Sequence, residues 1–139
     1  MKKEQENILI QGALTMRRRS YVPYSGFAVG AALLAKSGKI YQGCNIENIS
    51  FSATNCAERT AIFKAVSEGE LQFTGIAVAG GKAGNEPKDF CFPCAVCLQV
   101  MSEFCSPGFE ILIVKSEHEV KHYKLQELLP FAFDSLGKE

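Results

Sequence analysis

Three cysteines and a glutamate occur at spacings that suit a catalytic metal site. Cys56 precedes Glu58 by two residues, and further along the chain Cys94 and Cys97 form a Cys-x-x-Cys pair directly after a proline. Because positions three apart lie on one face of a helix, Cys94 and Cys97 can bind one ion, and Cys56 can reach that ion from a second helix. Three protein ligands leave one tetrahedral position open, which is typical of catalytic rather than structural zinc.

Glu58 supplies this predicted zinc site with a proton carrier. Hydrolytic deamination of a ring needs protons taken from water, one delivered to a ring nitrogen and one delivered to the departing amine, and a single carboxylate beside the metal can make all of these transfers. Zinc deaminases use such a glutamate, which is not itself a ligand. An acid in the first turn of a helix often has no catalytic role, but beside these cysteines Glu58 predicts hydrolytic deamination.

Arg59 is the predicted source of compensating charge. Zinc bound by three thiolates carries a net charge of minus one, which opposes the acidification of bound water. Two helix N-termini directed at the sulfurs would each bring roughly half a positive charge. Arg59, three residues after Cys56, can donate to a sulfur, and we expect it to contact the ligands and restore the acidity of the site.

Cys91 allows other interpretations of the cysteine cluster. The run Cys91-x-x-Cys94-x-x-Cys97 resembles the start of an iron–sulfur sequence, and with Cys56 it would supply four thiolates for a closed structural zinc site. Pro93 interrupts a single helix that would carry all three cysteines, which favours the catalytic site over both alternatives.

The remaining cysteines, histidines and basic residues have simpler interpretations. Cys44 and Cys105 are expected to be core or surface thiols. His118 and His122 lie in a polar segment and are expected to face solvent. The basic run 17–19 is predicted to face water at the end of a helix, where positive charge is favourable, rather than to bind RNA.

Composition favours one cytosolic domain with a small, neutral partner. The 139 residues suffice for one domain, 1–139, with its own core. Fifteen Lys and Arg balance fifteen Asp and Glu, so no global charge directs the chain to nucleic acid or to an anionic membrane. The N-terminus is polar, and no apolar run approaches the ~18 residues of a membrane span. Six cysteines in a reducing compartment favour metal binding over disulfides.

Hydrophobic periodicity predicts alternating helices and strands. We expect an α/β fold, a three-layer α/β/α sandwich around a mixed sheet of about five strands, which begins with an antiparallel hairpin. The predicted helices span 4–19, 56–69, 94–104 and 124–129, with the second strongly apolar and therefore buried; the predicted strands span 27–35, 39–44, 73–80, 109–114 and 119–123.

Four sequence segments together resemble one known family, the small homotetrameric cytidine deaminases with three zinc cysteines. The resemblance extends over nearly the whole chain. The segments are Tyr21-x-Pro23-Tyr24-Ser25-x-Phe27-x-Val29-Gly30, Asn45-Ile46-Glu47-Asn48, Cys56-Ala57-Glu58-Arg59 and Pro93-Cys94-x-x-Cys97-x-Gln99.

This resemblance implies hydrolysis of cytidine and 2′-deoxycytidine in pyrimidine salvage, with one zinc ion per subunit. By position it implies that Asn45 and Glu47 bind a ribose hydroxyl, that Phe27 forms an apolar wall and that the Ala57 amide holds the base. A paired amide and carboxylate on a loop suit a sugar hydroxyl on chemical grounds as well, because a buried polar pair rejects ligands that leave it unpaired. Asn45 alone would also suit a turn.

The resemblance further implies a homotetramer with active sites shared between subunits, because Phe133 matches an aromatic residue that enters a neighbour's pocket. Three positions depart from the family pattern: Ala95 replaces Gly, Leu98 replaces Arg, and Phe51, at the pocket rim, replaces Tyr. These departures concern substrate range and rate rather than the reaction class. The alternatives are a deaminase of a cytosine nucleoside antibiotic such as blasticidin S and, in another class, a nucleic-acid-binding or editing protein.

Overall fold

The computed structural model describes residues 1–137 and contains one five-stranded sheet with the order β2-β1-β3-β4-β5. β3 and β4 are parallel and the other neighbours are antiparallel, so the predicted mixed sheet is confirmed. Residues 138 and 139, the last two of the predicted domain, lie outside the described part. The strands are β1 (Phe27–Ala35), β2 (Ile40–Cys44), β3 (Phe73–Lys82), β4 (Glu110–Ser116) and β5 (Glu119–Lys124).

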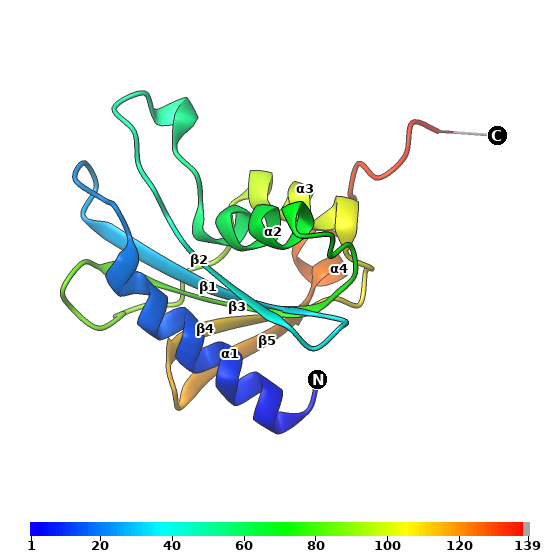
Figure 1. Cartoon of the computed structure of the whole chain (residues 1–139), viewed down its shortest axis with the longest axis horizontal. Coiled ribbons are helices and arrows are strands. Elements are labelled where there is room, and N and C mark those ends of the chain that lie inside the picture. The colour runs from blue at the N-terminus through cyan, green and yellow to red at the C-terminus, as the bar shows by residue number, and fades with distance from the viewer. Residues whose placement is uncertain (138–139) are drawn as a thin grey trace.

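Helices cover both faces of the sheet, as Figure 1 shows: α1 lies on one side and α2, α3 and α4 lie on the other. They are α1 (Lys3–Met16), α2 (Ala57–Ser67), α3 (Ala95–Phe104) and α4 (Leu125–Leu128), with 3₁₀ turns η1 (Arg17–Arg19) and η2 (Phe51–Ala53). The predicted three-layer α/β/α arrangement is therefore confirmed.

The central strands are apolar at nearly every position because both of their faces are buried. In β1, Leu33 packs with the α2 and α3 side, whereas its neighbour Leu34 packs with α1. In β4, Ile111 and Ile113 join the first cluster, and Leu112 joins the second. Successive strand side chains point to opposite faces, so a sheet covered on both sides requires a continuous apolar run.

Several element boundaries differ from the predicted ones. The first helix ends at Met16 and tightens into η1, which changes the surroundings of Arg17. β3 extends to Lys82 because it pairs with β1 along its whole length. The predicted burial of the second helix holds for one face of α2, which includes Ala61 and Ile62, whereas Phe63 on the other face is exposed.

Gly43 in β2 lets α2 approach the sheet closely. A Cβ atom at Gly43 would lie 2.5 Å from the carbonyl oxygen of Ala57 and 2.6 Å from the nitrogen of Ala61. Only glycine permits this contact, since those atoms belong to the backbone and cannot move aside. The first turn of α2, which holds Glu58, is thereby seated directly on the sheet.

Candidate metal centre and active site

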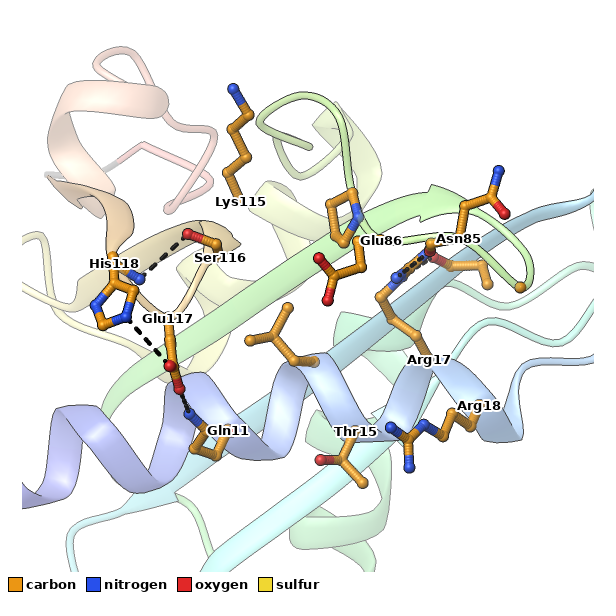
Figure 2. Close-up of a pocket in the computed structure, with 14 residues that line it drawn as sticks. Gln11, Thr15, Arg17, Arg18, Asn85, Glu86, Lys115, Ser116, Glu117 and His118 are labelled. Carbon is orange, nitrogen blue, oxygen red and sulfur yellow. Dashed lines mark hydrogen bonds and ion pairs between the residues drawn. The ribbon is translucent and has the colours of Figure 1, made fainter.

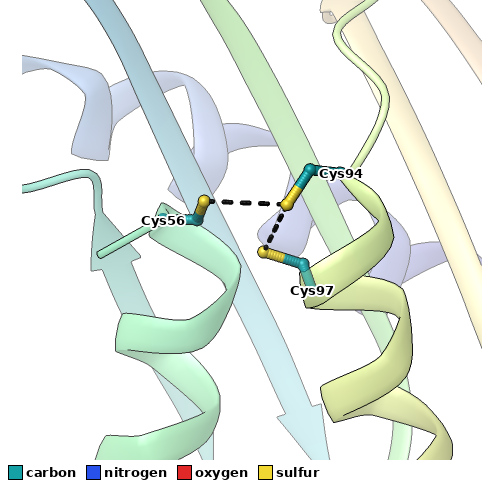
Figure 3. Close-up of side chains that lie close together, drawn as sticks. All are labelled: Cys56, Cys94 and Cys97. Atoms are coloured by element: carbon teal, nitrogen blue, oxygen red, sulfur yellow. Dashed lines mark hydrogen bonds between the residues drawn. The ribbon is translucent and has the colours of Figure 1, made fainter. Parts of the chain in front are cut away.

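The sulfurs of Cys56, Cys94 and Cys97 converge where α2 and α3 begin (Figure 3). The Sγ atoms of Cys56 and Cys94 are 4.0 Å apart, and those of Cys94 and Cys97 are 3.6 Å apart. All three lie within 4.8 Å of one another, close enough to bind one metal ion. Three thiolates from two helices are a donor set that suits tetrahedral zinc with one further position.

Cys56 and Cys94 occupy N-cap positions and not the first helical turns that the sequence predicted. α2 begins at Ala57 and α3 begins at Ala95, and both cysteines have extended backbone angles. Neither side chain makes a capping hydrogen bond, so both sulfurs are available to a metal. Each sulfur lies at the positive end of a helix dipole, which favours the thiolate form.

Arg59 contacts the cluster as predicted, with its Nη2 atom donating to the Cys56 sulfur at 3.2 Å. Hydrogen bonding to Cys97 and to Arg59 together lowers the pKa of the Cys56 thiol to about 5, although burial opposes this shift. Within residues 1–137, the buried Nε atom of Arg59 has no hydrogen-bond partner. No carboxylate is therefore bound to this nitrogen, and the positive charge of Arg59 is available to the sulfurs.

Glu58 is the one buried charged residue among those described, with only 4% of its surface exposed. Burial raises the pKa of its carboxyl group to about 7, and the nearby Cys56 adds to the rise. The adjacent Ala57 is fully buried at the first position of α2. The structure thus brings together Cys56, Cys94 and Cys97 with the carboxylate, the amide and the guanidinium that sequence analysis assigned to them.

Cys91 lies outside the group of converging sulfurs. Among the described residues, only Cys56, Cys94 and Cys97 form a group of metal-binding type. Burial raises the pKa of Cys91 to about 11, which keeps it a thiol near neutral pH. The iron–sulfur and four-thiolate interpretations both require Cys91 as a ligand, so this geometry favours the three-thiolate site.

Cys44 is buried, and Cys105 packs at the edge of the core, as expected for structural thiols. His118 and His122 are exposed, also as expected. None of these four residues contributes to the metal-binding group.

Asn45 and Phe27 are held together by hydrogen bonds to the β1 backbone. The Asn45 side chain accepts from the Val29 nitrogen at 2.9 Å and donates to the Phe27 carbonyl at 2.8 Å. Its oxygen acts as an acceptor for the strand, and one amide hydrogen remains for another partner. Phe27 is about half exposed at the start of β1 and lines a small cavity of about 210 Å³ together with Cys91.

Glu47 closes the turn before β1. Its carboxylate accepts from the backbone nitrogens of Tyr24 and Ser25 at 3.0 and 3.1 Å and from the Ser25 hydroxyl. The Ser25 hydroxyl bond lowers the pKa of Glu47, aided by the two backbone donors. A carboxylate offers about four acceptor positions, so Glu47 retains capacity for a ligand hydroxyl. Asn45 and Glu47 therefore shape the segment around Phe27.

Phe51 and Phe133 lie on exposed segments and are not part of the group of converging sulfurs. Phe51, in η2, is 74% exposed and meets Tyr24 edge to face, with ring centroids 6.5 Å apart. Phe133, in the C-terminal tail, is 68% exposed, and its carbonyl accepts from Nε2 of Gln99 at 2.8 Å. Within one chain, neither ring is covered by its neighbours.

A second cavity, of about 610 Å³, lies on the α1 side of the sheet (Figure 2). It is lined by residues of α1, η1 and β1 and by the segments 84–87 and 115–118, and contains none of the clustered cysteines. It is therefore separate from the candidate active site, and its size alone assigns it no chemistry.

Sequence reasoning missed two residues that hold segments of the site. Arg17 was predicted to face water, but its guanidinium hydrogen-bonds three backbone carbonyls. The prediction for the run 17–19 is therefore wrong for Arg17 alone, since Arg18 and Arg19 are exposed. Gln99, part of the recognised sequence pattern, had no assigned role and binds the C-terminal tail. The hydrogen-bond partners of Arg17 and Gln99 lie far from them in the sequence, so local sequence patterns do not reveal these contacts.

Comparisons with known proteins agree with this site. Residues 3–112 match the family described as the cytidine and deoxycytidylate deaminase zinc-binding region. A cytidine deaminase of Sporosarcina psychrophila is 46% identical over 125 residues, covering 90% of this chain and 88% of that protein. The crystal structure of a cytidine deaminase from Burkholderia pseudomallei is 40% identical with a TM-score of 0.83, covering 96% of this chain and 100% of that chain. The crystal structure of a cytidine deaminase from Mycobacterium tuberculosis is 34% identical with a TM-score of 0.75, covering 92% of this chain and 96% of that chain.

Proposed function

The chain belongs to the cytidine and deoxycytidylate deaminase family, and we propose that it hydrolyses cytidine and 2′-deoxycytidine to uridine and 2′-deoxyuridine with release of ammonia. The observation that carries this proposal is a group of three converging sulfurs beside a single buried carboxylate. The proposed catalytic domain spans 1–139.

Cys56, Cys94 and Cys97 would hold the zinc ion. Three features fit this role: the sulfurs converge as free thiols, the two N-cap sulfurs form no capping bonds, and Arg59 donates toward Cys56. Zinc held by three protein ligands supplies Lewis acidity at its fourth position. Arg59 and the two helix N-termini offset the negative charge of the thiolates, which would otherwise weaken that acidity.

Glu58 would carry the protons of the reaction. Its position at the start of α2 places the carboxyl next to Cys56 in a site shielded from bulk water. The carboxylate takes the two protons of the attacking water in turn and delivers one to the ring nitrogen and the other to the leaving amine. The backbone amide of Ala57, at the helix start, is free to donate to the base because first-turn amides lack partners within the helix.

Phe27, Asn45 and Glu47 would form the nucleoside side of the pocket. The remaining donor of Asn45 and the remaining acceptor positions of Glu47 suit a ribose hydroxyl, and both residues are held by the turn that they stabilise. The Phe27 ring would supply an apolar wall. Phe51 would lie at the rim, where it lacks the hydroxyl of tyrosine.

We also propose that the chain acts as a homotetramer with shared active sites, in which Phe133 enters the pocket of a neighbouring copy. Large apolar side chains are exposed on the loop before α2, on α2 and α3, and on the C-terminal tail, all on the side of the sheet opposite α1 (Figure 1). Exposed apolar area of this kind is typical of an interface. Light scattering of the purified chain measures the proposed mass, and a monomer at catalytic concentrations contradicts it.

The proposed setting is pyrimidine salvage in the cytoplasm. A reducing compartment keeps thiols available for metal, which suits the six free cysteines. Within the described residues, no helix is both long enough and apolar enough to cross a membrane.

The decisive experiment follows the loss of ultraviolet absorbance of cytidine together with ammonia release. Wild-type protein loaded with zinc should convert cytidine and 2′-deoxycytidine, and Glu58→Gln should lower kcat by at least about 100-fold, the scale of lost acid–base catalysis. The matched control is Glu68→Gln, an exposed acid at the other end of α2, which should retain full activity. Absence of turnover in the zinc-loaded wild type rejects the proposed function.

A further inference from the structure

We propose that Arg17 is a positioning residue for the metal centre: it fixes the start of the approach segment (residues 83–94), which joins β3 to α3 and ends at Cys94. This inference rests on the proposed function in one respect, namely that Cys94 is a metal ligand. The approach segment contains no helix or strand of its own, so its path depends on the contacts that hold it.

Arg17 makes three hydrogen bonds from one guanidinium group. Its Nε atom donates to the Ala28 carbonyl at 2.9 Å, Nη1 to the Asn85 carbonyl at 2.9 Å and Nη2 to the Lys82 carbonyl at 3.1 Å. Figure 2 shows Arg17 reaching toward Asn85, with Arg18 beside it pointing away. The three acceptors belong to β1, the last position of β3 and the approach segment.

Only an arginine fits this arrangement. A guanidinium presents its donors in a planar fork, whereas a lysine ammonium is a single point with no fixed donor plane. The carbonyls of Ala28, Lys82 and Asn85 come from different segments, so one rigid group holds them in a fixed relation. The bond to the Ala28 carbonyl is partly buried, so its loss leaves a polar group without a partner, whereas the bonds to Lys82 and Asn85 are exposed and act mainly by holding the two segments together.

The approach segment turns back over β3 directly beside Arg17. A Cβ atom at Gly81 would lie 2.9 Å from the Cα of Pro87 and 3.1 Å from Nη2 of Arg17. Gly81 therefore leaves room for both the guanidinium and the returning chain. The backbone nitrogen of Ala83 also donates to the Gly26 carbonyl at 2.7 Å, which ties the same turn to the residue before Phe27.

Aromatic contacts then guide the segment to the metal ligands. The Nζ atom of Lys121 lies 4.5 Å from the Phe90 ring centroid, and the rings of Phe92 and Tyr123 are 5.5 Å apart. Arg17 thus secures the first part of the segment and β5 secures the last part, immediately before Cys94.

The test uses zinc-loaded protein and two measurements that do not depend on turnover. The first is the rate of zinc release to a chromogenic chelator, and the second is the rate of trypsin cleavage after Lys88, within the approach segment. Arg17→Gln should increase both rates at least fivefold, and Arg17→Lys should give intermediate rates. Arg18→Gln, the matched control on the neighbouring residue, should leave both rates within twofold of wild type.

Ile10→Val serves as a control for general loss of stability, because Ile10 is buried on α1 away from the approach segment. Equal rates for Arg17→Gln and Arg18→Gln overturn the inference. Rates for Ile10→Val as fast as those for Arg17→Gln, at the same midpoint of urea unfolding, also overturn it. Wild-type protein that holds no zinc rejects the proposed function instead, and cleavage after Lys88 still reports whether Arg17 fixes the segment.

Discussion

The Nη2 atom of Arg59 lies 3.2 Å from the sulfur of Cys56, three residues earlier on the same chain segment. This contact places a permanent positive charge against one of three clustered thiols. At position 98, where the family usually has a second arginine, this chain has Leu98. Only 8% of this side chain is exposed, and it packs in the core. Arg59 is therefore the arginine whose donor reaches the sulfurs.

Arg59→Gln should lower the zinc affinity or kcat/KM by about 10- to 100-fold, the usual effect of removing a residue that supports metal ligands. The physical reason is that glutamine keeps a hydrogen-bond donor but removes the charge that stabilises thiolate. Competition with a chelator gives the affinity, and cytidine turnover gives kcat/KM. Lys64→Gln, a basic residue elsewhere on α2, is the control, and unchanged zinc affinity and turnover in Arg59→Gln would contradict the assignment.

Leu98→Ala should reduce the free energy of unfolding by about 2–5 kcal/mol, the range for truncating a buried leucine. Val96, on the same helix, is 55% exposed, so Val96→Ala should change stability by no more than about 0.5 kcal/mol. Urea unfolding followed by circular dichroism measures both. Equal losses in the two variants would show that Leu98 does not contribute to the core.

Zinc removal should destabilise the folded chain. A ligand that binds only the folded state adds RT ln(1 + [L]/Kd) to stability, about 4 kcal/mol at 1,000 times Kd. Thermal unfolding with and without a chelator should therefore show a clear drop in Tm for wild type. Cys97→Ser should lose most of this chelator-dependent drop, whereas Cys105→Ser should keep it. If the chelator leaves the Tm of the wild type unchanged, the folded chain binds no metal and the prediction is contradicted.

Stability should fall at alkaline pH in part through Cys105. Burial raises the pKa of this thiol from 9.0 to about 12 in the folded chain. As pH rises above about 9, the unfolded chain loses this proton first, so the free energy of unfolding decreases until the folded thiol also ionises near pH 12. Between pH 8 and pH 10 the loss from this group amounts to about 1 kcal/mol.

The measurement for Cys105 is urea unfolding at pH 8 and pH 10 in the presence of reductant. Cys105→Ala should lose less stability between these two pH values than wild type. Its lower stability at pH 8, which reflects lost packing, does not enter the comparison. The same pH dependence in both proteins would show that the Cys105 thiol ionises equally in the folded and unfolded states.

Local patterns predicted the elements well where a strand is buried on both faces or where a tight turn joins two strands. The hairpin of β1 and β2 follows from two apolar runs around Ser37-Gly38, and its first strand begins and ends at the predicted residues. The predicted helix starts at Cys56 and Cys94 were each one residue early, because an N-cap residue has extended backbone angles although it stands at the helix boundary. The first helix ends three residues before its predicted end because the chain continues beyond Met16 as the 3₁₀ turn η1, which local periodicity does not distinguish from an α-helix.

The chemistry of the site was present in the residue types and their order. The sequence contains two thiols three residues apart, and a third thiol followed by a carboxylate two residues later and by an arginine three residues later. These groups form a metal-binding and proton-carrying set when α2 and α3 begin side by side. Continuous apolar runs likewise determined that the central strands are covered on both faces. These properties are local, because they depend on helical and strand periodicity within a few residues.

Tertiary structure decided which groups act together across the chain. It brought Cys56 within 4.0 Å of Cys94, left Cys91 outside the sulfur cluster, and turned Asn45 and Glu47 toward the backbone around Phe27. It also turned Arg17, one of three consecutive arginines, into a ligand for three distant carbonyls. The reason is that a buried polar group must find partners in the folded chain, and those partners are set by strand order and helix packing rather than by neighbours in sequence.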